Sequence, residues 1–454
     1  MTECNQSEFE FQAHFSRRVV AAFDGGAMTS DAGGLLLRQT DRRLNLVARL
    51  AACFLDGRDP RLVRHSVTEL IAQRVYGLAL GYEDVNDHDQ LRQDPLLRVL
   101  AGKADVDQPL AGKSTLNRLE LSEGTPDRYK KITYWKAAID ELLVDLFLES
   151  LAEAPPEIVL DLDTTDLELH GGQEGRFFHG YYDEYCYLPL YIFCGEHVLC
   201  ARLREANIDA AAGSLQEVRR IVERIRTRWP EVRILLRGDS GFCRDELMDW
   251  CEGHNVQYVF GVARNQRLRQ IIAPQLAQAA VEYQRSGRPA RVFTEFWHET
   301  TTGSWSRARR VIAKAEHIAG KENPRYVVTS LAAAEWPAAR LYEQLYCARG
   351  EMENRIKEQF QLFADRVSSE TMRANQLRVY LAAMAYTLVS GLRRLGLSAT
   401  DLARAEAATI RTRLLKIGAL VRVSVRRVVL SMAAGYPWAG LFAQAHAALT
   451  AATG

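Results

Sequence analysis

The stretch that decides the fold is "ILLRGDSGF" at residues 234–242, in which an apolar strand ends on a carboxylate, Asp239. A second stretch, "IVLDLDTT" at residues 158–165, has the same form and ends close to Asp163. Both runs are rich in branched apolar residues, which favour strands. If the two strands lie side by side, two carboxylates that are distant in sequence meet at one edge of a sheet.

The same stretch contains two short motifs known from other settings. "RGDS" (237–240) is a cell-adhesion tetrapeptide, but adhesion requires an exposed loop and the preceding "VRILL" is typical of a buried strand. "GDSG" (238–241) matches the box around the nucleophile of chymotrypsin-like proteases, which also need a separately placed His and Asp. Phe242 stands where those proteases have a second glycine. We therefore favour a carboxylate at the end of a strand.

Composition indicates a globular protein with several domains. The chain has 454 residues, of which 47% are hydrophobic and 25% charged, so we expect two to four domains. The N-terminus has no signal-peptide pattern, and the longest mostly apolar stretch, residues 380–392, is too short to cross a bilayer. The eight cysteines form no C-x-x-C pair. These features predict reduced thiols and a cytoplasmic location without a membrane partner.

The charge is unevenly distributed. Residues 366–454 contain twelve Lys or Arg and three Asp or Glu, a net charge of +9 in a chain whose total is +1. A basic C-terminal lobe indicates a polyanion such as nucleic acid, although an Arg-rich solvated surface is the alternative. Within it, residues 419–432 alternate between valines and polar residues. We expect one strand there, with Arg422 and Arg426 on its cationic face, where they would bind the phosphates of a nucleic acid.

The order of predicted elements after "PPE" (155–157) is β-β-β-α-β-α-β. This order is that of the ribonuclease-H-like fold, in which three antiparallel strands are followed by parallel strands added through helices. The predicted strands are 158–165, 185–194, 197–203, 232–239 and 256–263, and the predicted helices are 214–229 and 244–254. The fold class is therefore α/β, and it places the strands that carry Asp163 and Asp239 next to each other.

The pattern predicts five parts along the chain. A mainly helical, DNA-binding N-terminal region covers 1–154, and the two parts of the ribonuclease-H-like core cover 155–265 and 324–390. Between them, residues 266–323 form a β-rich insertion subdomain, and 391–454 form the basic lobe.

A predicted long helix, residues 338–363, offers a third carboxylate. Tyr346, Arg349, Glu353 and Lys357 are spaced at 0, 3, 7 and 11, which places all four on one helical face. An ordinary ion pair between Arg349 and Glu353 is the alternative explanation.

Three carboxylates can hold two divalent cations. Mg²⁺ prefers hard oxygen ligands, and two ions can activate a hydroxyl and stabilise the leaving oxygen of a phosphodiester. We predict Asp163, Asp239 and Glu353 as catalytic metal ligands, with Asp161 as the alternative first acid. Arg349 and Lys357 stand beside them and are predicted to hold phosphates.

Taken together, these residues resemble the DDE transposases of bacterial insertion sequences, in the branch with a Tyr-x-x-Arg-x-x-x-Glu signature and a β insertion. The acids are separated by 76 and 114 positions, and the second gap leaves room for the insertion. Within that branch, the chain resembles the insertion-sequence family numbered thirteen-eighty. The segments that carry the resemblance are "YCARGEME" (346–353), "DTT" (163–165), "RGDSGF", "MTSDAGGLLLRQTD" (28–41), "HGYYDEYCYLPLYIFCGEH" (179–197) and "ENRIKE" (353–358).

The resemblance implies an Mg²⁺-dependent endonuclease and strand-transfer enzyme of a mobile element, with Mn²⁺ as a substitute ion. Its partners would be the terminal inverted repeats and target DNA, bound by a homodimer in the synaptic complex without a nucleotide cofactor. Tyr346 would join Arg349 and Lys357 at the DNA phosphates. Relatives have a Lys where this chain has Phe360, and Lys357 can take its place. Another nuclease of the same fold, or an inactive DNA-binding derivative, remains an alternative.

Overall fold

The computed structural model describes residues 8–300 and 303–451, which form two compact units. Unit 1 comprises the described parts of Met1–Tyr134 and Met384–Gly454 together with Gln361–Phe363. Unit 2 comprises Trp135–Phe360 and Ala364–Ala383. The long helix α14 (Met372–Gly396) begins in unit 2 and ends in unit 1.

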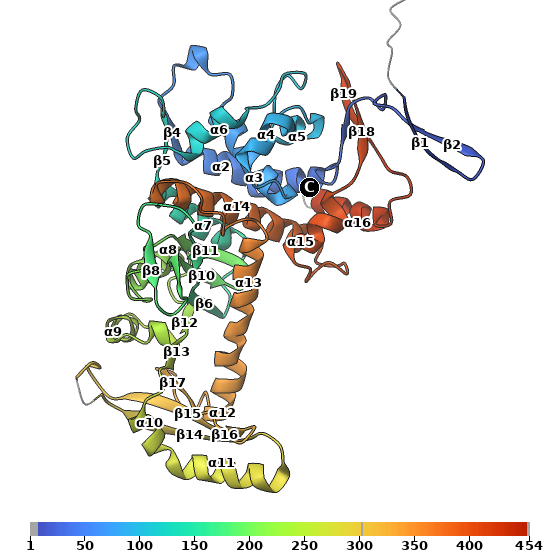
Figure 1. Cartoon of the computed structure of the whole chain (residues 1–454). Coiled ribbons are helices and arrows are strands. Elements are labelled where there is room, and N and C mark those ends of the chain that lie inside the picture. The colour runs from blue at the N-terminus through green and yellow to red at the C-terminus, as the bar shows by residue number, and fades with distance from the viewer. Residues whose placement is uncertain (1–7, 301–302, 452–454) are drawn as a thin grey trace, which may run out of the picture. The chain divides into compact units, whose positions relative to one another are not determined.

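Unit 1 is mainly helical, as the sequence predicts for its N-terminal part (Figure 1). Its helical elements are α1 (Gly34–Leu44), α2 (Leu46–Ala52), η1 (Pro60–Leu62), α3 (Val67–Leu80), η2 (Val85–Asp87), α4 (His88–Leu91), α5 (Pro95–Leu100), α6 (Lys113–Glu120), α15 (Ala407–Ile410), η6 (Arg411–Leu415) and α16 (Ala439–Ala451). Its strands are β1 (Phe9–His14), β2 (Arg17–Ala21), β3 (Met28–Thr29), β4 (Phe54–Asp56), β5 (Ile132–Tyr134), β18 (Ala419–Ser424) and β19 (Arg427–Met432). The antiparallel pair β1–β2 was not predicted.

The prediction of one strand over residues 419–432 is wrong. The chain turns at Val425 and Arg426, and β18 pairs with β19 in an antiparallel hairpin. Alternation of valines and polar residues runs through the turn, and the stretch contains no Gly, Pro, Asn or Asp to mark it. The turn is closed by Ser424, whose Oγ accepts a hydrogen bond from the Arg427 amide at 3.2 Å.

Unit 2 is built on a large mixed sheet with the strand order β11-β10-β6-β12-β13-β17-β15-β14 (Figure 1). The pairs β6–β10 and β10–β11 are antiparallel, whereas β6–β12 and β12–β13 are parallel. The strands are β6 (Glu157–Thr164), β10 (Leu190–Cys194), β11 (His197–Arg202), β12 (Arg233–Gly238), β13 (Gln257–Val262), β14 (Ala290–His298), β15 (Arg309–Ile318), β16 (Lys321–Glu322) and β17 (Arg325–Thr329). The predicted neighbours β6 and β12 are adjacent.

Two parts of the sheet differ from the predicted pattern. The strand predicted over 185–194 is interrupted at Pro189, which lacks the amide proton that a central strand needs. Its first half is β9 (Glu184–Tyr187), which joins a small sheet with β7 (Leu167–Glu168) and β8 (Phe177–His179). The strands of the predicted insertion, β14 and β15, pair with each other as expected and extend the large sheet through β17.

Helices cover both faces of the large sheet. The larger core lies on the face covered by α7 (Lys136–Glu149), α8 (Ser214–Arg228), α9 (Asp245–Gly253), α10 (Gln266–Ile271) and α11 (Ala273–Ser286). On the other face, Leu235, Val259 and Val327 pack against Leu341, Tyr342 and Leu345 of the helical segment that begins at residue 338. Burial of these side chains fixes which strand residues face that segment.

All seven cysteines in the described part of the chain are free thiols, and four of them are buried. Cys4 lies outside the described residues. Helix α14 has 25 residues, yet no helix within residues 8–300 and 303–451 is long and apolar enough to cross a lipid bilayer.

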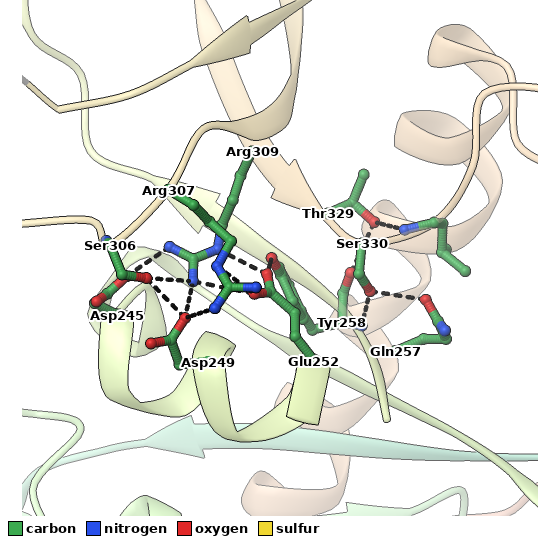
Figure 2. Close-up of polar contacts among 11 residues, drawn as sticks. Asp245, Asp249, Glu252, Gln257, Tyr258, Ser306, Arg307, Arg309, Thr329 and Ser330 are labelled. Carbon is green, nitrogen blue, oxygen red and sulfur yellow. Dashed lines mark hydrogen bonds and ion pairs between the residues drawn. The ribbon is translucent and has the colours of Figure 1, made fainter. Parts of the chain in front are cut away.

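A buried arginine joins β15 to α9 (Figure 2). The side chain of Arg309 is only 2% exposed, and its guanidinium contacts Asp245, Asp249 and Glu252 at 2.5, 2.7 and 2.8 Å. The three acids share one face of α9 because they are spaced four and three residues apart. Burial alone would raise the pKa of Asp245, but hydrogen bonds from Ser306 and Arg309 hold it below its usual value.

Removing this buried cation should destabilise the fold. We expect Arg309→Ala to lower the free energy of unfolding by about 3 kcal/mol, because three clustered carboxylates lose their common partner. Arg307 contacts Asp249 and Glu252 at 3.3 and 3.4 Å, but its side chain is 59% exposed. Arg307→Ala is therefore the matched control and should cost less than about 1 kcal/mol. Urea unfolding of both variants measures the difference, and equal losses would contradict this account.

Candidate active site

Strand alternation decides which face of the sheet carries the predicted acids. In β6, the even-numbered Ile158, Leu160 and Leu162 pack into the larger core. Successive side chains of a strand point to opposite faces, so Asp161 and Asp163 lie on the face covered by the helical segment from residue 338.

The register between β6 and β12 brings the two predicted aspartates together. Gly238 pairs with Leu162 in the parallel ladder, so Asp239 follows at the position that corresponds to Asp163. A short 3₁₀ turn, η3 (Ser240–Phe242), begins directly after Asp239. The Gly241 amide donates a hydrogen bond of 2.8 Å to Asp239 Oδ1, which fixes the carboxylate at the end of the strand.

The helical segment is less regular than the sequence predicts. Instead of one helix over 338–363, the chain forms α12 (Ala338–Arg340), the π-helix η4 (Leu341–Tyr346), the 3₁₀-helix η5 (Cys347–Arg349) and α13 (Gly350–Phe360). The prediction that Tyr346, Arg349, Glu353 and Lys357 share one face assumed a constant number of residues per helical turn. That number changes twice between Leu341 and Gly350. Such π turns are frequent at functional sites.

Arg349 connects the acid of the sheet with the acid of the helix. Its Nη1 donates a hydrogen bond of 2.9 Å to Asp163 Oδ2, and its Nη2 lies 3.7 Å from Glu353 Oε1. The other oxygen of Asp163 accepts a hydrogen bond of 2.9 Å from the Thr164 amide. Asp163 and Arg349 are mostly buried, whereas the Glu353 side chain is 54% exposed. Glu353 is therefore the most accessible of the three acids.

The electrostatics show that the three acids share one environment. Burial raises the pKa of Asp163 to about 6, and the negative charges of Asp239 and Glu353 act in the same direction. Arg349 opposes this shift. Burial alone would lower the pKa of Arg349, but Asp163, Asp239 and Glu353 together with Tyr346 keep it above its usual value. The structure thus brings these acids around one guanidinium.

Asp161, the alternative first acid, is engaged elsewhere. Its carboxylate accepts two hydrogen bonds from Arg237, at 2.6 and 2.7 Å, and Arg237 also donates to the Leu345 carbonyl at 2.8 Å. Both side chains are at most about one-tenth exposed. This pair ties β6 and β12 to the helical segment above them. Asp161 is therefore committed to Arg237, whereas Asp163 contacts Arg349 of the signature.

A glycine in β13 makes room for the tyrosine of the signature. A Cβ at Gly261 would lie 2.7 Å from Tyr346 Oη, 2.9 Å from the Ser240 amide nitrogen and 3.1 Å from the carbonyl carbon of Asp239. Burial raises the pKa of Tyr346. The sequence analysis missed Gly261, although a glycine inside a strand is a signal of close backbone approach.

The remaining predicted residues are spread over both units. Lys357 is exposed on α13, one turn after Glu353. Arg422 lies on β18 of unit 1, and Arg426 occupies the turn of the hairpin instead of the cationic face predicted for it.

The three acids fit a hard divalent cation by their chemistry, because carboxylate oxygens are the ligands that Mg²⁺ prefers. Within the described residues, however, no three His, Cys, Asp or Glu side chains are already gathered around a metal position. Arg349 is bonded to Asp163 and lies close to Glu353. A cation held by these carboxylates would therefore compete with the ion pairs of Arg349.

Comparison with known proteins identifies the family. A family model described as "Transposase DDE domain group 1" matches residues 11–453. The chain belongs to this family. Membership assigns it to DNA transposition, a form of DNA recombination, and makes it a DDE transposition enzyme.

No curated protein matches the chain. Among solved structures, the piggyBac transposase synaptic complex with hairpin DNA is similar at a TM-score of 0.41 and 12% sequence identity. The match covers 85% of this chain and 79% of that chain.

The close approach at Gly261 gives a prediction for this enzyme. Gly261→Ala must displace the backbone at Asp239 or the Tyr346 hydroxyl, and a shift of about 1 Å can lower a rate on the order of a hundredfold. Gly253→Ala is the control, since a Cβ there meets nothing within 4 Å. DNA cleavage and thermal unfolding are measured for both variants. Full cleavage activity in Gly261→Ala would contradict the assigned packing.

Proposed function

We propose that the chain is the transposase of a bacterial insertion sequence, which binds the terminal inverted repeats of its element and catalyses DNA cleavage and strand transfer. The observation that carries the proposal is the convergence of Asp163 and Asp239 from paired strands on Arg349 and Glu353. Membership of the DDE transposase family supports it. The resemblance of the signature segments to the family numbered thirteen-eighty supports the bacterial origin.

The proposed architecture is a ribonuclease-H-like core with an insertion. The order β11-β10-β6-β12-β13, with the first three strands antiparallel and the last three parallel, supports this assignment. Residues 266–323 would be the insertion, and their strands lengthen the core sheet.

Asp163, Asp239 and Glu353 would hold the divalent cations, two Mg²⁺ or Mn²⁺ ions. When bound, these ions supply activation of the attacking hydroxyl and stabilisation of the leaving oxygen. Asp163 and Asp239 lie at the ends of two paired strands, and Glu353 lies on a helix. Regular secondary structure therefore holds the backbone of all three acids in place without the ions. Such pre-positioning limits the reorganisation that the reaction requires.

Arg349, Tyr346 and Lys357 would contact the phosphates of the DNA strand that is cut. Arg349 has the strongest case, because a guanidinium pairs with a phosphate through two parallel hydrogen bonds. It now contacts Asp163 and Glu353, so it stands beside the residues that would hold the ions. The synaptic partner would be a second copy of the chain.

The test compares charge-neutralising substitutions at the three acids with the same kind of substitution at a neighbouring glutamate. We expect Asp163→Asn, Asp239→Asn and Glu353→Gln each to abolish Mg²⁺-dependent cleavage and strand transfer on a duplex that carries the element's own end. DNA binding in EDTA should persist, because none of the three acids is proposed to contact the DNA itself. Glu351→Gln, two residues from Glu353 on the same helix, is the matched control and should cut normally.

Three outcomes would contradict this function. Normal cleavage by any one of the three variants would show that the substituted acid is not part of the site. Cleavage without joined products would favour another nuclease of the same fold, and no cleavage by the wild-type chain despite DNA binding would indicate an inactive derivative. Asp161→Asn should instead lower stability, since it breaks the buried pair with Arg237.

A further inference from the structure

The hairpin β18–β19 has two chemically different faces. Directly paired residues of an antiparallel ladder share a face, so Ala419, Val421 and Val423 lie on one face with their partners Met432, Leu430 and Val428. The opposite face carries Leu420, Arg422 and Ser424 with Ser431, Val429 and Arg427. The register thus puts Arg427, and not Arg426, on the same face as Arg422.

Only the base of the hairpin is packed. Ala419 and Leu420 pair with the two residues of β3, and the Val421 amide donates to the Ala27 carbonyl at 2.8 Å. The apolar face at the base joins a small core with Ala32 and Ile417. Beyond this base, every residue from 422 to 429 is exposed. Figure 1 shows β18 and β19 as a ribbon that extends beyond α16.

The exposed half carries a concentrated positive charge. Residues 419–432 contain three arginines and no acidic residue. Arg422 donates one hydrogen bond of 3.4 Å to Ser431 Oγ, and none of the three arginines forms an ion pair with a residue that the structure describes. Arg422 and Arg427 are diagonal neighbours, about 7 Å apart across the two strands. That spacing lets the two guanidinium groups reach separate phosphates of one DNA strand.

The turn departs from the chemistry of tight hairpins. Two-residue turns usually carry Gly, Asn or Asp, because both central residues adopt positive φ. Here the central residues are Val425 and Arg426, and neither has positive φ. The Val425 side chain is fully exposed. Both Val425 and Arg426 are exposed, so both are available for contact with a partner.

We propose that the β18–β19 hairpin is a DNA-binding ribbon that lies in a groove of duplex DNA, with Arg422 and Arg427 on its polar face contacting phosphates. A two-stranded ribbon fits the major groove of B-form DNA, and the concentrated positive charge complements the phosphate backbone. Val425 and Arg426 form the turn at the tip of the hairpin, beyond the paired residues that would contact phosphates. The proposal rests on the proposed function, since it requires a chain that acts on duplex DNA.

The test measures the affinity of the full chain for a mixed-sequence DNA duplex in EDTA over a range of salt concentrations. For Arg422→Ala/Arg427→Ala we expect affinity to fall on the order of tenfold or more, and the slope of log affinity against log salt to decrease by roughly 1.8. The matched control is Arg42→Ala/Arg404→Ala, which removes two exposed arginines of unit 1 outside the hairpin. The control should bind with nearly the wild-type slope.

Two further variants separate charge from structure. Arg422→Lys/Arg427→Lys keeps both positive charges and should retain most of the salt dependence. Val428→Ala changes the apolar face and should leave the slope unchanged.

The outcomes distinguish this proposal from the proposed function. If the wild-type chain does not bind DNA, the proposed function itself fails. If the wild type binds and Arg422→Ala/Arg427→Ala binds equally well, only the ribbon proposal is overturned. An equal loss in Arg42→Ala/Arg404→Ala would also overturn it, because the effect would then reflect overall charge. A changed oligomeric state at unchanged DNA affinity would make the hairpin an interface between copies instead.

Discussion

The parallel pairing of β6 with β12 is the constraint on which the site depends. It sets Gly238 beside Leu162 and therefore carries Asp239 to the position next to Asp163. A shift of one residue would turn every side chain of a strand to the other face, so the branched apolar residues that fill the larger core also fix the orientation of the acids. The packing of one face of the sheet therefore sets the orientation of the acids on the other face.

Arg349 balances the charge that this pairing creates. Burial raises the pKa of Asp163, and the negative charges of the neighbouring Asp239 and Glu353 raise it further. The guanidinium contacts Asp163 directly and lies close to Glu353. In the proposed function, a phosphate of DNA would replace the acids as the partner of this guanidinium when cations bind the carboxylates.

The sequence predicted the paired strands that carry Asp163 and Asp239, because apolar runs that end on carboxylates are local patterns. It did not predict the Arg237–Asp161 pair or the contact between Gly261 and Tyr346, since both depend on which residues face the helical segment after folding. The changes from α-helix to π-helix and 3₁₀-helix around Arg349 could not be predicted, because no residue type in this segment marks them. In the hairpin, alternation continued through a turn without turn residues, so one strand was predicted where the chain reverses and Arg427 replaces Arg426 on the cationic face.

Binding of Mn²⁺ to the full chain without DNA, measured by electron paramagnetic resonance, tests the central claim most directly. The claim is that Asp163, Asp239 and Glu353 form a cation site, and that Arg349 competes with the cation for their carboxylates. The account predicts that Asp239→Asn weakens Mn²⁺ binding, because a ligand is lost, and that Arg349→Ala strengthens it, because a competing ion pair is removed. Wild-type Mn²⁺ affinity in Asp239→Asn, or weaker binding in Arg349→Ala, would contradict the account.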